Sequence, residues 1–147
     1  QDFQKQTAKL KSNISGASKY VKEMSNRLKH VMKTLDQTAL TTAQDDDNAR
    51  EVMGQLASIK LLLSGDAIKS SANEKSPMGL SSRINSIIGG HWDTQAAPFA
   101  MYKNAFTIAT IEYKALVDKI RVADKRLDDL ETNLDNTNAP WTPGRKL

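Results

Sequence analysis

The stretch that decides the fold is residues 98–134, PFAMYKNAFTIATIEYKALVDKIRVADKRLDDLETNL. Its apolar residues return in alternating steps of about three and four positions: Phe99, Tyr102, Phe106, Ala109, Tyr113, Leu116, Ile120, Ala123, Leu127, Leu130 and Leu134. This spacing is a heptad repeat that lines one face of a helix, whereas a half-buried strand needs period two. No glycine or proline follows Pro98 within the stretch. It therefore predicts a helix of roughly 55 Å, at about 1.5 Å per residue, whose apolar face needs partner helices.

The start of the chain carries a second repeat of the same kind. Its members are Phe3, Thr7, Leu10, Ile14, Ala17, Val21, Met24, Leu28, Val31 and Leu35. They predict a helix over residues 2–36, within which Glu23 and Arg27 have the spacing of a favourable i,i+4 pair. Gly16 lies inside this helix, either where a small face lets another helix approach closely or as a tolerated glycine that costs about 1 kcal/mol relative to alanine.

Two shorter helices are predicted between these long ones. One covers residues 48–64 after Asp45, Asp46 and Asp47, because negative charge is favourable before a helix start. The other covers residues 80–88 and ends at Gly89 and Gly90. The last helix is predicted over residues 95–135, and an irregular tail over residues 136–147, where two prolines and a glycine oppose helix.

These elements predict an all-α fold in one domain over residues 1–147. It is an antiparallel helical bundle of three long helices plus one short helix, resembling a four-helix bundle. Two arrangements remain open for the short helix, which either joins the bundle as a full member or covers one of its ends.

Composition and charge narrow the classes of function. The 147 residues carry a net charge of +4 and no cysteine, so a disulfide or thiolate metal site is impossible. Apolar runs are too short to span a membrane. The basic residues of the first helix spread over several faces without alternating aromatic residues, so we expect no nucleic-acid partner. Because the chain begins at Gln1 without a leader, we expect a processed product or an excised domain.

We expect no catalytic, cofactor-binding or metal-binding residues, and hence no enzyme. The two histidines, His30 and His91, do not pair at metal-ligand spacing, and Asp128 and Asp129 fall off the core face and should be solvated. The residues expected to take part in interactions are Trp92, Trp141 and Arg145. Trp141 is a large anchor that either folds back on the bundle or docks on a neighbouring domain.

Short motifs suggest a family. Residues 95–98, QAAP, precede the long helix, and residues 139–145, APWTPGR, follow it; residues 1–6, QDFQKQ, and 80–84, LSSRI, extend the likeness. With this layout the chain resembles the helical C-terminal region of bacterial sortilin-like proteins. These are large extracytoplasmic proteins with β-propellers of BNR (Asp-box) repeats, often labelled glycosyl hydrolases. Where that family tends to have Pro-Thr at the start of the last helix, this chain has Pro98 and Phe99.

The resemblance implies a secreted or periplasmic parent protein and an upstream propeller as the partner of this helical region. On that basis we expect a non-catalytic domain with a structural or interaction role. Two alternatives remain. The chain is part of a carbohydrate-active enzyme whose active site lies in a propeller outside these residues, or it is a coiled-coil module that associates with a second copy of itself as a homodimer.

Overall fold

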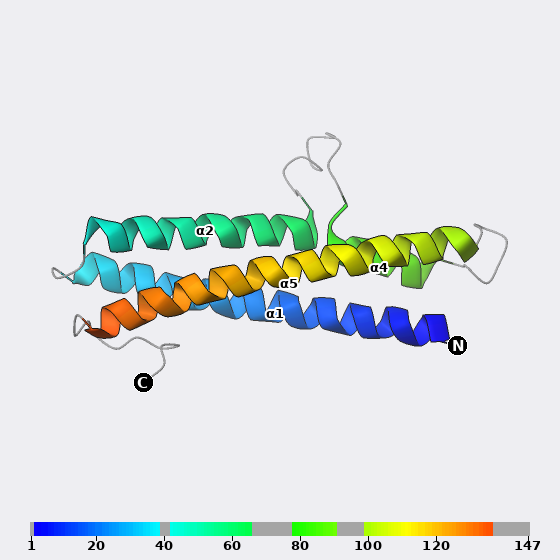
Figure 1. Ribbon diagram of the computed structural model, residues 1–147, viewed down its shortest axis with the longest axis horizontal. Helices are drawn as coiled ribbons and strands as arrows, with labels where there is room; N and C mark the ends of the chain where they lie inside the picture. The colour runs from blue at the N-terminus through cyan, green and yellow to red at the C-terminus, as the bar shows by residue number, and fades with distance from the viewer. Residues whose placement is uncertain (1, 39–41, 66–77, 91–98, 137–147) are drawn as a thin grey trace. The chain divides into compact units, whose positions relative to one another are not determined.

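The computed structural model describes residues 2–38, 42–65, 78–90 and 99–136. These residues form four helices and contain no strand, which confirms the predicted all-α helical bundle (Figure 1). The helices are α1, Asp2–Gln37; α2, Ala43–Ser64; α4, Leu80–Gly89; and α5, Phe99–Asn136. The predicted first four residues of the last helix, 95–98, and all but the first residue of the predicted tail lie outside the described residues.

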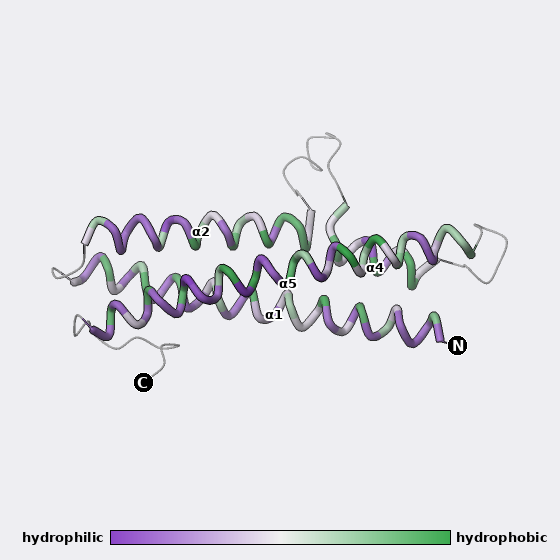
Figure 2. Tube along the Cα trace, in the orientation of Figure 1, coloured by the Kyte–Doolittle hydropathy of each residue, from purple (hydrophilic) through white to green (hydrophobic). Residues whose placement is uncertain are grey.

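Apolar segments recur along each helix (Figure 2), and the buried residues follow the spacing seen in the sequence. In α1 they include Leu10, Ile14, Val21, Met24, Leu28 and Val31, and in α5 Ala109, Leu116, Ile120, Ala123, Leu127, Leu130 and Leu134. Burying each leucine or isoleucine contributes about 1.5–3 kcal/mol relative to leaving it exposed, so these faces hold the helices together. Phe99 is an exception to the predicted core, because it stays 39% exposed.

Helix α2 begins five residues earlier than predicted. Its cap is Thr42, whose Oγ1 accepts a hydrogen bond from the backbone N–H of Asp45 at 3.3 Å. The Asp45 carboxylate in turn accepts from the Thr42 backbone N–H at 3.1 Å. This reciprocal capping box places Asp45 and Asp46 in the first turn of the helix rather than before it. Their charge still favours the helix start, but from inside it.

Helix α2 ends as predicted at Ser64, followed by Gly65. Gly65 has φ of 76°, a left-handed conformation that glycine adopts readily, and its N–H donates to the Leu61 carbonyl at 2.8 Å. Gly79, which precedes α4, lies directly against this turn. A Cβ added to Gly79 would stand 2.5 Å from the Gly65 nitrogen and from the Ser64 carbonyl carbon.

The chain forms two compact units. Unit 1 comprises Gln1–Ser18 and Lys60–Val117, and unit 2 comprises Lys19–Ile59 and Asp118–Leu147. The first half of α1, the last residues of α2, all of α4 and the first half of α5 belong to unit 1; the remaining parts of α1, α2 and α5 belong to unit 2. The single domain expected over residues 1–147 stays a prediction.

In unit 1, α4 is a full member of the helix packing. Its residues Leu80, Ile84 and Ile87 are at most 4% exposed. Arg83, near its start, pairs with Glu112, whereas Gly90, just past its end, lies against Tyr102, so α4 runs antiparallel to α5. The short helix therefore packs alongside the other helices of unit 1 and does not cover an end of them. The Phe3 ring of α1 packs edge-to-face on Phe99 and Phe106, with centroids 5.1 and 5.6 Å apart.

In unit 2, three helices share one core. Buried residues come from α1 (Val21, Met24, Leu28, Val31 and Leu35), α2 (Ala49, Val52, Leu56 and Ile59) and α5 (Ile120, Ala123, Leu127, Leu130 and Leu134). Here α1 and α5 run in the same direction, because Tyr20 contacts Asp124 and the later Arg27 also reaches Glu131. Helix α2 runs opposite to both (Figure 1).

Gly16 and Gly79 provide a matched test of these contacts. A Cβ on Gly16 would meet nothing within 4 Å, so this residue is a tolerated helix glycine and not a point of close approach. Gly16→Ala should therefore raise the free energy of unfolding by about 0.5–1 kcal/mol. Gly79→Ala should lower it by about 1–3 kcal/mol, since the new Cβ would displace backbone. Urea denaturation of both variants measures this, and a loss of stability in Gly16→Ala would contradict the assignment.

Candidate functional site

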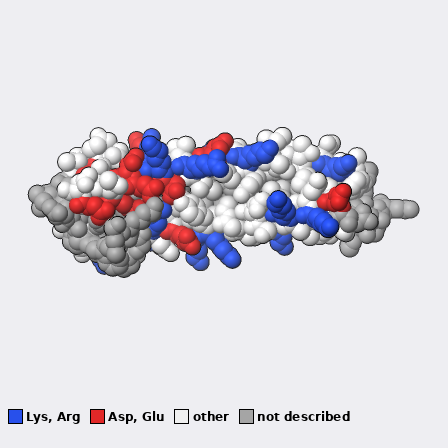
Figure 3. All heavy atoms as spheres, turned by 60° about the horizontal axis from the view of Figure 1, so that its bottom comes forward, with Lys and Arg blue, Asp and Glu red and all other residues white. Residues whose placement is uncertain are grey.

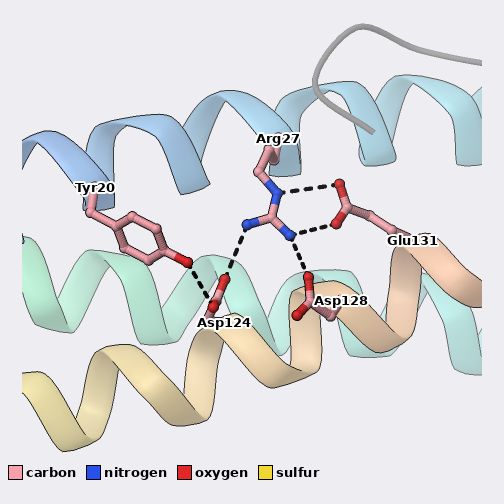
Figure 4. Close-up of polar contacts among 5 residues, drawn as sticks. All are labelled: Tyr20, Arg27, Asp124, Asp128 and Glu131. Atoms are coloured by element: carbon pink, nitrogen blue, oxygen red, sulfur yellow. Dashed lines mark hydrogen bonds and ion pairs between the residues drawn. The ribbon is translucent and has the colours of Figure 1, made fainter. Parts of the chain in front are cut away.

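A cluster of polar residues joins α1 to α5 in unit 2 (Figure 4). We call it the Arg27 cluster; its members are Tyr20, Arg27, Asp124, Asp128 and Glu131. Tyr20 and Arg27 are seven residues apart on α1, and the three acids are spaced by four and three residues on α5. Both spacings return to the same helix face, so each helix presents its members as one row beside its apolar face.

Arg27 is the centre of this cluster. Its Nη1 lies 3.0 Å from Asp124 Oδ1, and its Nη2 lies 2.7 Å from Asp128 Oδ1. Glu131 receives two bonds, at 2.5 Å from Nη2 to Oε1 and at 3.3 Å from Nε to Oε2. The planar guanidinium thus binds one carboxylate in bidentate fashion and two others singly, which makes strong, charge-assisted hydrogen bonds with defined directions.

Tyr20 extends the row by donating its hydroxyl proton to Asp124 Oδ2 at 2.7 Å. This hydrogen bond, then burial and the charge of Asp124, raise the pKa of Tyr20 to about 12. For Arg27, burial acts to lower the pKa. The hydrogen bonds and charge of Glu131, together with the bonds to Asp124 and Asp128, outweigh burial and raise the pKa above its usual value. The guanidinium therefore stays protonated wherever the fold persists.

The cluster is half-buried and carries more negative than positive charge. The side chains of Arg27 and Glu131 are 16% and 7% exposed, whereas that of Asp128 is 42% exposed. The positive charge of Arg27 compensates the charge of Glu131, the most buried of the three carboxylates. Water screens the charges of Asp124 and Asp128, which are more exposed. On the face drawn in Figure 3, acidic side chains of unit 2 gather in one area.

The Arg27 cluster joins α1 to α5 through ion pairs and hydrogen bonds. All three carboxylates bind Arg27. Over residues 2–38, 42–65, 78–90 and 99–136, no group of three or more His, Asp or Glu side chains is arranged to hold a metal ion. The arrangement fixes how α1 and α5 pair.

One sequence prediction about these residues is wrong. Arg27 is predicted to pair with Glu23 on its own helix, but it binds three acids of α5 instead. Asp128, predicted to be solvated, is 42% exposed and also binds Arg27. Local spacing could not show this, because an i,i+4 pair is the only partner visible within one helix. The available signal was the row of acids at Asp124, Asp128 and Glu131, repeating beside the apolar face of α5.

A second feature lies on the surface of unit 1. Eleven large apolar side chains are exposed among the described residues, and eight of them belong to unit 1. These eight are Leu61, Leu62, Met78, Ile88, Phe99, Met101, Ile108 and Ile111. Met101 and Ile111, on α5, are 61% and 63% exposed. Scattered exposed apolar residues are ordinary, but a concentration in one unit marks a candidate contact surface.

An open groove between α4 and α5 adjoins this surface. Its volume is about 270 Å³, and its lining includes Met78, Arg83, Ile87, Met101, Tyr102 and Ala105. Glu112 pairs with Arg83 beside it, with Nε 2.8 Å from Oε1. Gly90 lies directly against the Tyr102 ring, which would have to shift if Gly90 carried a Cβ.

The three residues predicted for interactions, Trp92, Trp141 and Arg145, lie outside the described residues. The structure therefore neither brings them together nor separates them. Three residues of the candidate contact surface, Met101, Ile108 and Ile111, lie on α5 at positions that the heptad pattern placed off the core face. The signal that could have found them was their large apolar side chains at positions where solvent-facing residues were expected.

Removal of Arg27 tests whether the Arg27 cluster stabilises the pairing of α1 with α5. Arg27→Met should lower the free energy of unfolding by about 2–3 kcal/mol, because it leaves Glu131 buried and unpaired and three carboxylates side by side. Arg50→Met is the matched control, since Arg50 is 73% exposed and pairs with Asp46 on its own helix. That control should change stability by less than about 0.5 kcal/mol. Equal effects of the two variants in urea denaturation would show that Arg27 is no more important than a surface cation.

Tyr20 gives a pH-dependent signature. Its pKa is raised in the folded state, so its hydrogen bond stabilises the fold fully below the unfolded pKa of about 10 and is lost as pH rises to about 12. Tyr20→Phe should therefore be less stable than the parent chain at pH 8, and the difference should shrink between pH 10 and 12. Subtracting the absorbance titrations of the two proteins at high pH isolates Tyr20. A midpoint near 10 would contradict the bond to Asp124.

No match to this chain is found among family models, curated proteins or solved structures. The arrangement of the Arg27 cluster and of the unit 1 surface therefore has to be interpreted from the chain's own residues.

Proposed function

We propose that this chain is a non-catalytic helical domain that serves as an interaction module of a larger extracytoplasmic protein. The observation that carries the proposal is the concentration of exposed apolar side chains in unit 1, eight of the eleven on the described surface. Exposed apolar side chains favour contact with another protein surface, because covering them removes apolar area from water.

The polar chemistry supports a role without catalysis. The carboxylates of the Arg27 cluster are engaged by one guanidinium, which stabilises the pairing of α1 with α5. The groove of unit 1 contains one ion pair, Arg83 with Glu112, at its side and mostly apolar groups elsewhere. An acid and a base converging on a substrate would be needed for general acid–base catalysis, and the described part of the groove offers an ion pair instead.

The identity of the larger protein is proposed from the resemblance to the helical C-terminal region of sortilin-like proteins. In that setting the partner is an upstream β-propeller of the same polypeptide, and the protein is periplasmic or secreted. Any action on sugars would then belong to the propeller. Within the described residues, no helix combines the length and apolar character needed to cross a bilayer.

Self-association is the second candidate. Met101, Ile108 and Ala115 are spaced seven residues apart on α5 and are exposed, and Ile111 lies on the same side. This spacing is that of a coiled-coil interface, so a second copy of the chain could cover it.

Hydrogen exchange tests the proposal. The chain should be measured alone and as part of the longer polypeptide that its gene encodes, with light scattering to give the mass of each. Residues 99–115 of α5 should exchange more slowly in the longer protein, because the upstream domain covers their exposed side. Residues 43–59 of α2 in unit 2 are the control and should not change. A gene without an upstream propeller, or equal exchange in both proteins, would overturn the proposal; a dimer of the isolated chain would favour self-association.

A further inference from the structure

We draw no further inference here: the strongest candidate, the exposed apolar side chains of α5 in unit 1 together with the open groove beside α4, is an apolar surface, and nothing in the described part of the chain shows what covers it.

Discussion

Burial of the apolar face of α5 is the constraint on which the structure depends. The face continues from Ala109 to Leu134, and its residues join the core of unit 1 and then that of unit 2. Each buried leucine contributes about 1.5–3 kcal/mol, a large amount compared with the net stability of about 5–15 kcal/mol of an ordinary domain. The other helices are arranged so that each unit covers its own part of this face, with α1 and α4 in one and with α1 and α2 in the other.

Apolar burial alone does not fix which residues of two helices meet, because neighbouring turns of a heptad repeat are chemically similar. In unit 2 the Arg27 cluster selects which residues of α1 and α5 meet. A shift of α5 by one turn would separate the guanidinium from Glu131, which is nearly buried, and would leave its charge without compensation. The cluster therefore contributes to the uniqueness of the pairing as well as to its stability, while its more exposed members, such as Asp128, contribute less.

Unit 1 has a different surface character, and the difference bears on function. Helix α4 lies along one side of α5 from Tyr102 to Glu112, and another side of α5 carries the exposed apolar residues Met101, Ile108 and Ile111. The groove next to Arg83 and Tyr102 adjoins these residues through Met101. Unit 2, by contrast, covers its helices more completely and gathers acidic residues around one arginine. The proposed interaction role rests on these exposed apolar side chains of unit 1.

The sequence by itself determined the helices and their buried faces, because a three-four repeat of apolar residues has one geometric solution. It also predicted the turn at Gly65, and it missed the start of α2 because Thr42 and Asp45 cap each other only once the chain has turned. Tertiary structure alone decided that Arg27 leaves Glu23 for three acids on α5, and that Gly16 has an open surface. It also decided that Met101 and Ile111 of α5 are exposed. These outcomes depend on which helices are neighbours in space, and such contacts between residues about a hundred positions apart leave no local pattern in the chain.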